Sequence, residues 1–298
     1  MIDSASKLFF AWLRLLRPRQ VLKNGFVILP LIFSGEFRHL PSILLALAGF
    51  AAFALASMGI YCWNDALDVE ADRRHPKKRF RPVASGDISR RSAFLAGLLL
   101  IFGSLGLSLA INVWMLGVLA GYVVLQIAYC LRWKHVPLLD VMAIASGFLL
   151  RVVAGAMAIG VVPSSWLLIC TTFLALLLAL VKRRQEVVLL SQSTVSEGTR
   201  RVLAHYPLPL LDQLIAGLVP TTLLSYMLYA YHVQPPAFLA TSAFVAYGLF
   251  RYLYLMHTRE AGEQPEDVLL KDPATLLNVV AWAIVSGGCL LLLSPKLH

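Results

Sequence analysis

The chain has 298 residues, of which 59% are hydrophobic and only 14% carry a formal charge. Soluble globular proteins are about one quarter charged, so this composition and its many long apolar runs exclude an ordinary water-soluble domain and indicate a membrane protein. The net charge of +10 at pH 7 would suit nucleic acid. In a membrane protein, such charge is instead typical of loops that lie against anionic lipid or of sites for phosphorylated ligands. We therefore expect no nucleic-acid partner.

Apolar runs separated by turn signals predict an all-α, polytopic membrane fold with nine membrane-spanning helices. The spans are expected at 20–34, 41–64, 92–111, 114–131, 137–160, 164–182, 210–232, 236–256 and 275–294. The first is the least regular because it contains Lys23 and Pro30. We expect one helical membrane domain over residues 1–298, with a first half at 20–160 and a second at 164–294.

The distribution of basic residues predicts the orientation of the chain. Nearly all of its 26 lysines and arginines fall in the N-terminal segment and in loops on one side of the expected spans. Arg38 and Lys296 are on the other side, and Arg151 is inside a span. The positive-inside rule therefore predicts a multi-pass protein of the cytoplasmic membrane with a cytoplasmic N-terminus and an outside C-terminus.

One face at the end of the second expected span gathers four oxygen-bearing side chains. The four, which fall within an arc of about 100° on a helix, are Asn64, Asp65, Asp68 and Asp72. Carboxylates this close repel one another unless a cation lies among them, and such ligands suit Mg²⁺, which shares its other positions with substrate phosphates. A basic tract follows at once: Arg73, Arg74, Lys77, Lys78, Arg79 and Arg81. The pattern predicts a diphosphate site. The alternative is a solvated helix end whose carboxylates pair with the arginines.

Polar residues inside or at the ends of other spans are further candidates, because ionisable groups at membrane depth are costly. Arg151 is too deep to reach the interface easily, so it needs an internal partner: Asp140, an aspartate of the acidic face or a bound phosphate. The others are Lys23, Asn24, Tyr129, Lys134, Lys182, Arg183 and Glu186. For Lys23 and Lys182, near span ends, snorkelling to the interface is the alternative.

These motifs resemble a known family. N-D-x-x-D-x-x-x-D at Asn64–Asp72 and R-P-x-Q-x-x-K-N at Arg17–Asn24 are similar to the UbiA-type intramembrane prenyltransferase superfamily. Longer stretches resemble its decaprenyl-phosphate phosphoribosyltransferase branch. They are N-D-x-x-D-V-E-A-D-R-x-H-P-x-K-R-F-R-P (64–82), A-Y-C-x-x-x-K-H (128–135), K-R-x-x-E (182–186) and P-E-D-x-x-L-x-D (265–272).

One departure from the wider superfamily is informative. Prenyl-diphosphate users carry a second aspartate-rich motif after the sixth helix, where this chain has the basic sequence KRRQE at 182–186. One Mg²⁺ motif and one cationic motif suit two phosphorylated substrates. The resemblance implies Mg²⁺-dependent transfer of 5-phosphoribose from 5-phosphoribosyl 1-diphosphate to a polyprenyl (decaprenyl) phosphate for arabinan and cell-wall precursors. The distribution of basic residues predicts that the active-site cavity faces the cytoplasm, and homo-oligomerisation is left open.

The resemblance also implies roles for residues of this chain. Magnesium is expected at Asn64, Asp65, Asp68 and Asp72. Catalysis is expected from Asp65, Asp68, Asp72 and Lys182. The donor is expected to contact Lys23, Tyr61, Lys78, Arg79, Arg81 and Lys134, with further substrate contacts from Asn24 and Tyr129. The acceptor phosphate is expected at Arg151, Lys182 and Arg183, with Glu186 at the ribose or at Lys182. Glu266, Asp267 and Asp272 fit the branch pattern, but a structural loop paired with Arg259 or Lys271 is the alternative.

Two other functions are compatible with the pattern. The first is a prenyltransferase that moves a prenyl group from its diphosphate to an aromatic acceptor. The second is an organic-anion transporter, which embedded Lys, Arg and Asp residues would suit. Transporters usually have internal repeats and polar groups near the bilayer midplane, whereas most charges here gather at one end of the spans.

Overall fold

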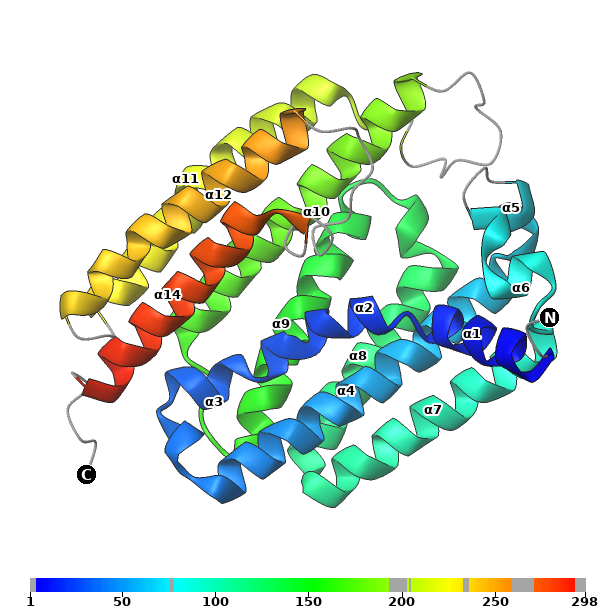
Figure 1. Ribbon diagram of the computed structural model, residues 1–298, viewed down its shortest axis with the longest axis horizontal. Coiled ribbons are helices and arrows are strands. Elements are labelled where there is room, and N and C mark those ends of the chain that lie inside the picture. Colours follow the sequence, from blue (N-terminus) through cyan, green and yellow to red (C-terminus); the bar gives the residue numbers. More distant parts are fainter. Residues whose placement is uncertain are drawn as a thin grey trace. The chain divides into compact units, whose positions relative to one another are not determined.

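The computed structural model describes residues 4–74, 78–192, 203, 205–232, 236–258 and 271–292. Over these residues the chain forms helices and no strand, which confirms the predicted all-α class. Close contacts divide the described residues into two compact units, one up to Pro163 and one from Ser164 (Figure 1).

Eight helices among the described residues are long and apolar enough to cross a membrane. They are α4 (Leu40–Leu67), α7 (Arg90–Ile111), α8 (Val113–Leu131), α9 (Leu139–Ile159), α10 (Ser165–Gln192), α11 (Leu208–His232), α12 (Ser242–Thr258) with the preceding 3₁₀ helix η6 (Pro236–Thr241), and α14 (Pro273–Leu292). Each corresponds to an expected span. Helix α10 continues beyond the expected end at 182, because the sequence KRRQEVVLLSQ contains neither glycine nor proline to stop it.

The first expected span, 20–34, is not a continuous helix, so the count of nine is not confirmed. Its residues form three short pieces: α2 (Pro18–Val21), the 3₁₀ helix η1 (Leu22–Val27) and α3 (Leu29–Phe33). Pro18 and Pro30 each stand in the first turn of a piece, where a missing N–H is tolerated. Arg17, just before Pro18, adopts a left-handed conformation with φ of 52°. A residue before proline is disfavoured in the right-handed helical region, which explains the break between α1 (Ser4–Leu16) and α2.

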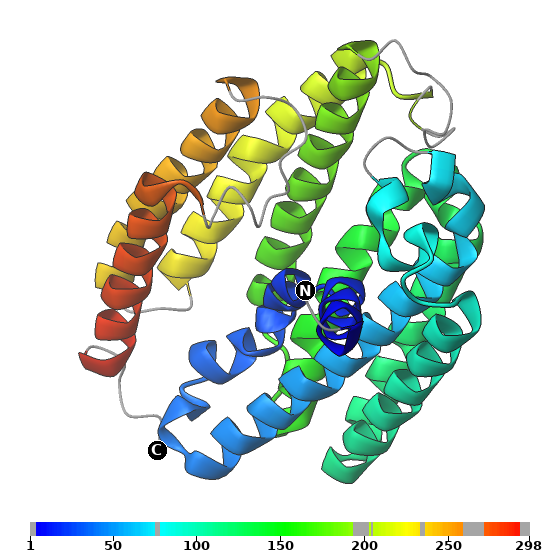
Figure 2. The ribbon, with the colours of Figure 1, turned by 45° about the vertical axis from the view of Figure 1, so that its right-hand side comes forward.

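Short elements complete the first unit. They are α1 (Ser4–Leu16), η2 (Glu36–Arg38), α5 (Val69–Arg74), η3 (Lys78–Phe80), α6 (Pro82–Ser85) and η4 (Trp133–His135). Helix α1 is amphipathic: Ala11 and Leu15 are buried against residues at the end of α4, while Phe9 and Phe10 are exposed. Figure 2 shows α1 nearly end-on, crossing α4. The helix therefore adds its apolar face to the end of α4 that carries the acidic residues.

Helices α4 and α7 pack closely through glycine. A Cβ atom on Gly59 would lie 2.8 Å from the carbonyl oxygen of Gly97, so only glycine permits this approach. Trp63 stacks on Phe94 with ring centroids 5.4 Å apart and donates its indole N–H to the Phe94 carbonyl at 3.0 Å. Small residues at such contacts are typical of helix pairs in membranes. This packing fixes α4, the helix that carries the acidic face.

The second unit is built from α10, α11, α12 and α14, of which α11, α12 and α14 lie side by side in Figures 1 and 2. A polar contact joins two of these helices: Trp282 of α14 donates its indole N–H to the Tyr226 hydroxyl of α11 at 2.8 Å. The same hydroxyl hydrogen-bonds Thr241 of η6 at 2.8 Å. Pairing polar groups inside the unit satisfies them away from water.

Candidate active site

The acidic face lies where α4 ends and α5 begins. Asp68 caps α4, and its backbone N–H donates to the Asn64 carbonyl at 2.9 Å. Asp72 continues the turn on α5, with its N–H bonded to the Asp68 carbonyl at 2.8 Å. The chain therefore remains nearly helical through the motif. This local geometry is the reason that 3.6-residue periodicity predicts which side chains share the face.

Arg81 joins two of the carboxylates. Its Nη1 atom donates to Asp72 Oδ2 at 2.7 Å and to Asp65 Oδ1 at 3.2 Å. Both aspartates are buried, with exposed fractions of 2% for Asp65 and 3% for Asp72. Two buried carboxylates near one nitrogen would repel each other strongly without the cation between them. The pairing of these aspartates with an arginine of the basic tract agrees with the alternative interpretation of the pattern, although the site is buried rather than solvated.

Asp68 pairs with a lysine from a distant part of the sequence. Lys134 Nζ donates to Asp68 Oδ1 at 2.7 Å and to Oδ2 at 2.9 Å, and the lysine is only 5% exposed. Lys134 belongs to η4, the short turn between α8 and α9. Nearby, Cys130 Sγ lies 3.6 Å from Asn64 Oδ1. The A-Y-C-x-x-x-K-H and N-D-x-x-D motifs therefore contact each other.

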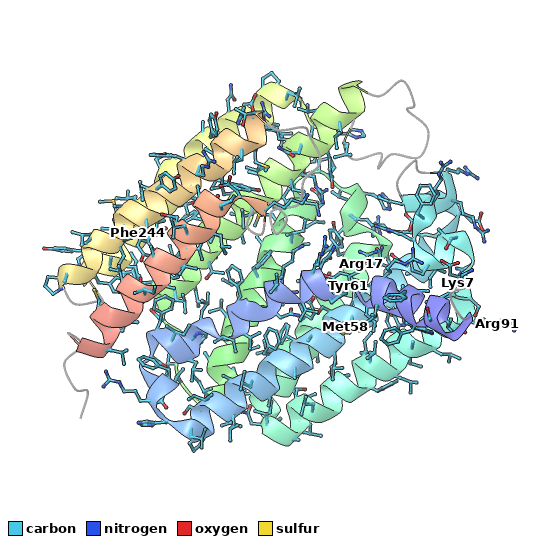
Figure 3. The ribbon with its side chains drawn as sticks, viewed as in Figure 1. Lys7, Arg17, Met58, Tyr61, Arg91 and Phe244 are labelled. Carbon is cyan, nitrogen blue, oxygen red and sulfur yellow. The ribbon has the colours of Figure 1, made fainter. Side chains whose placement is uncertain are left out.

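Arg17 is a site residue that is absent from the expected set. Its guanidinium forms an ion pair with Asp65, and its Cζ atom lies 5.0 Å from the centre of the Tyr61 ring. Figure 3 shows the side chains of Arg17 and Tyr61 together, where α2 passes α4. The left-handed backbone conformation at Arg17 turns the chain here, next to Asp65 and Tyr61. The sequence signal that could have identified Arg17 is its place as the first residue of the R-P-x-Q-x-x-K-N motif.

The site is balanced in charge. Three carboxylates, those of Asp65, Asp68 and Asp72, contact three cations. The cations are Arg17, Arg81 and Lys134. Among the described residues, no group of three or more acidic, histidine or cysteine side chains is arranged to hold a metal ion. The oxygen donors themselves fit Mg²⁺. A metal-bound diphosphate would have to draw the cations from the carboxylates onto its own phosphate oxygens.

Other predicted donor contacts lie around this cluster. Lys78 is half-buried on η3, and Arg79 beside it is exposed with its Cζ atom 4.8 Å from the Phe80 ring centre. Tyr129 is half-buried on α8, next to Cys130. Lys23 is half-buried on η1. Lys77 lies outside the described residues. Direct substrate contact by these side chains stays a prediction.

Asn24 and Arg151 form a separate buried network. Arg151 Nε donates to Asn24 Oδ1 at 2.8 Å, and Arg151 Nη2 donates to the Tyr122 hydroxyl at 2.9 Å. Asn24 Nδ2 in turn donates to Ser57 Oγ at 3.0 Å. The internal partners of Arg151 are thus an amide, a phenol and the Gly147 carbonyl. They are not Asp140 or an aspartate of the cluster, which were the protein groups considered from the sequence.

The basic motif K-R-x-x-E lies within α10 of the second unit. Arg183 is fully buried and forms an ion pair with Glu186, one helical turn further on. Between them, Gln185 donates to the Met256 carbonyl at 2.8 Å. Lys182 is half-buried. The carboxylate of Glu186 compensates for the burial of the Arg183 charge. The expected role of these residues at an acceptor phosphate stays a prediction.

Asp272 has a structural role at the start of α14. Arg251 binds its carboxylate through two nitrogens, at 2.9 and 3.1 Å, and Thr275 donates its backbone N–H at 2.9 Å. These contacts, Arg251 first, hold the pKa of the Asp272 carboxyl well below its usual range. The partner Arg251 was not anticipated from the sequence. Glu266, Asp267 and Arg259 of the same expected loop lie outside the described residues.

Replacing Asp272 with alanine should therefore destabilise the protein in a pH-dependent way. Loss of a helix cap alone costs about 1 kcal/mol. A carboxyl with a depressed pKa stabilises the fold above its unfolded pKa of about 3.9, and this stabilisation is lost as pH falls below that value. Thermal denaturation in detergent should show a lower midpoint for the variant at pH 7 and a smaller difference near pH 3. An equal difference at both pH values would contradict the assignment.

Comparisons with known proteins place this geometry in a family. A model of the UbiA prenyltransferase family matches residues 26–270. The chain belongs to this family. The motif resemblance is confirmed, and with it a multi-pass membrane protein. The UbiA-type fold agrees with the solved structure of a UbiA homolog from Archaeoglobus fulgidus bound to GPP and Mg²⁺. The TM-score is 0.71 at 20% identity, over 94% of this chain and 97% of the other.

Relatives from the branch that the motifs resemble match almost the whole chain. A decaprenyl-phosphate phosphoribosyltransferase from Corynebacterium glutamicum is 32% identical over 281 residues, covering 91% of this chain and 83% of the relative. The protein of the same name from Mycolicibacterium smegmatis is 32% identical over 299 residues, covering 93% and 92%. Both UbiA motifs at the start of this chain lie within the ordered first unit described above.

Proposed function

We propose that this UbiA-family protein transfers the 5-phosphoribosyl group of 5-phosphoribosyl 1-diphosphate to a polyprenyl phosphate and releases pyrophosphate. The observation that carries the proposal is the charge-balanced cluster, in which each of the three carboxylates is already paired with a cation. Such a cluster can exchange its internal ion pairs for a metal-bound diphosphate without leaving any charge unpaired. The relatives named for this reaction support the choice of substrates.

Donor binding uses the residues of the first unit. The oxygen donors of Asn64, Asp65, Asp68 and Asp72 would hold Mg²⁺, which neutralises charge on the departing pyrophosphate. Lys134 and Arg81 each lie within 2.7 Å of a carboxylate oxygen and would turn to phosphate oxygens when the donor binds. Arg17 would keep Asp65 paired during this exchange. Catalysis then rests mainly on positioning the two substrates and on cations placed where negative charge develops on the departing pyrophosphate.

The acceptor needs no general base. A phosphomonoester has its second pKa near 6, so a polyprenyl phosphate is already an anion at pH 7 and can attack the anomeric carbon directly. The C1–O bond to pyrophosphate breaks as the new C1–O bond to the acceptor phosphate forms. We assign the acceptor phosphate to Lys182 and Arg183 of α10, with the prenyl chain between helices. The charge asymmetry of the loops supports a cytoplasmic N-terminus and a donor site on the same side of the cell membrane.

The decisive experiment uses purified protein in lipid nanodiscs with ribose-labelled phosphoribosyl diphosphate and decaprenyl phosphate. Label should pass into an organic-soluble lipid, with one pyrophosphate released per lipid, and EDTA should stop the reaction until Mg²⁺ is restored. Parallel reactions supply a prenyl diphosphate with an aromatic acceptor. Prenyl transfer without any lipid-linked pentose phosphate would overturn the proposal. Uptake of an organic anion into proteoliposomes without covalent product would also overturn it and favour a transporter.

A further inference from the structure

Arg151 lies in the middle of α9, where its charge meets only neutral partners. The side chain is 5% exposed, and each of its three nitrogens donates to protein. The acceptors are Asn24 Oδ1 at 2.8 Å, the Gly147 carbonyl at 2.8 Å and the Tyr122 hydroxyl at 2.9 Å. A guanidinium remains charged in proteins, so these contacts must be kept to compensate for its burial.

Aromatic faces complete the surroundings of the guanidinium. Its Cζ atom lies 4.8 Å from the ring centre of Tyr122, 5.5 Å from that of Phe148 and 5.8 Å from that of Phe53. Aromatic faces attract a cation without adding an anion. The site around Arg151 is therefore built to hold this one cation in place. Each guanidinium nitrogen already donates to a neutral protein group, so the side chain links its neighbours to one another.

Asn24 is the partner that connects Arg151 to the rest of the site. It is fully buried, and both ends of its amide are occupied, one by Arg151 and the other by Ser57 of α4 at 3.0 Å. Asn24 belongs to η1, a six-residue 3₁₀ helix that interrupts the first apolar segment. Short 3₁₀ helices are held weakly by their own hydrogen bonds, so the position of η1 depends on its contacts with other helices.

A second, independent contact holds η1 against α9, the helix that carries Arg151. A Cβ atom on Gly155 would lie 2.0 Å from the Val27 carbonyl oxygen, so the backbone of η1 touches α9 where only glycine fits. Val27 itself is fully buried. Gly155 is one helical turn beyond Arg151. The irregular segment is thus fixed against α9 at two points, Asn24 and Val27.

The network around Arg151 and the acidic cluster both involve residues of α4 and α8, at different levels along these helices. Ser57 precedes Asp65 by eight residues on α4, and Tyr122 precedes Cys130 by eight residues on α8, a rise of about 12 Å in each case. The chain that leaves η1 toward the N-terminus runs through α2 to Arg17, the partner of Asp65. Lys23, a predicted donor contact, is the neighbour of Asn24.

We propose that Arg151 is a positioning residue. By holding Asn24, it fixes the irregular segment of residues 18–27 and so places Lys23 and Arg17 at the donor site. The proposal rests on the proposed function for the donor, and it replaces the sequence-based assignment of Arg151 to the acceptor phosphate. The geometry that carries it is that each of the three Arg151 nitrogens donates to a group of the first unit.

The test compares a direct change, Arg151→Met, with a milder one, Ser57→Ala, that removes the far anchor of Asn24. For Arg151→Met, KM for phosphoribosyl diphosphate should rise about tenfold or more, because small displacements of binding groups are costly. KM for decaprenyl phosphate should stay within about twofold. Ser57→Ala should raise the donor KM about two- to fivefold, as expected for one hydrogen bond. The matched control is Ser104→Ala, since buried Ser104 bonds only its own helix, at the Ile101 carbonyl.

A structural measurement checks the same proposal without using activity. Spin labels on Leu22→Cys and Met142→Cys, both exposed positions, report the distance between η1 and α9 in protein whose Cys170 and Cys289 are replaced by alanine. The distance distribution should broaden in Arg151→Met and Ser57→Ala and stay narrow in Ser104→Ala. An unchanged distribution, or a rise in acceptor KM alone, would overturn the proposal. If the parent protein does not use phosphoribosyl diphosphate, the proposed function fails, while the distances still decide whether Arg151 fixes η1.

Discussion

Replacing Asp68 with asparagine is expected to lower Mg²⁺-dependent turnover by about a hundredfold or more, because one charged metal ligand and the partner of Lys134 are lost together. The change keeps the shape of the side chain and the cap at the end of α4. Asp68 is partly exposed and bonded by Lys134 at 2.7 Å, so it is the carboxylate that a donor can reach most directly. The measurement is kcat/KM for phosphoribosyl diphosphate over a range of Mg²⁺ concentrations.

A matched control comes from the same segment. Glu70 on α5 is exposed and pairs on the surface with Arg73 at 3.2 Å, so Glu70→Gln should leave turnover nearly unchanged. A double variant separates two roles for Asp68. If the carboxylate only neutralises Lys134, adding Lys134→Met to Asp68→Asn should restore activity, since both charges are then gone. Metal binding predicts that the double variant stays inactive. Full activity in Asp68→Asn alone would refute the metal assignment.

The sequence predicts the fold well where one physical signal dominates. Runs of about 20 apolar residues are long enough to cross a bilayer, and eight such runs are helices in the structure. The signal fails at 20–34, where apolar composition alone does not reveal that the 3₁₀ helix η1 interrupts the segment between α2 and α3. It also misses the extension of α10, because polar residues end a span without ending a helix.

The site was predictable as far as it depends on local geometry. Asp65 and Asp72 share a face because the chain stays nearly helical between them, so periodicity was sufficient. Their partners depend on which helices cross. Nothing in the sequence places Arg17 against Asp65 across a left-handed turn, or Asn24 against Arg151 across 127 positions. Pairings of this kind are set by tertiary packing, which a single sequence does not display.

Arg81→Gln is expected to impair both stability and turnover, because Arg81 Nη1 contacts two buried carboxylates. Breaking a buried ion pair costs about 3–5 kcal/mol. Arg17 still holds Asp65, and the Arg81 side chain is 25% exposed, so we expect about 2 kcal/mol of destabilisation. Turnover should fall about a hundredfold, because a cation placed at the developing pyrophosphate charge is also removed.

The effect of Mg²⁺ on the thermal midpoint of Arg81→Gln distinguishes two roles for Asp65 and Asp72: binding the metal, or only pairing with Arg81. With Arg81 gone, Asp72 loses its arginine partner and Asp65 keeps only Arg17, so a divalent cation gains more by binding there. A ligand that binds only the folded state raises the thermal midpoint, so Mg²⁺ should stabilise Arg81→Gln more than the parent protein. Arg79→Gln, at an exposed guanidinium of the same basic tract, should respond to Mg²⁺ like the parent. If Mg²⁺ shifts all three midpoints equally, the two buried aspartates do not bind the metal, and Arg81 serves only the fold.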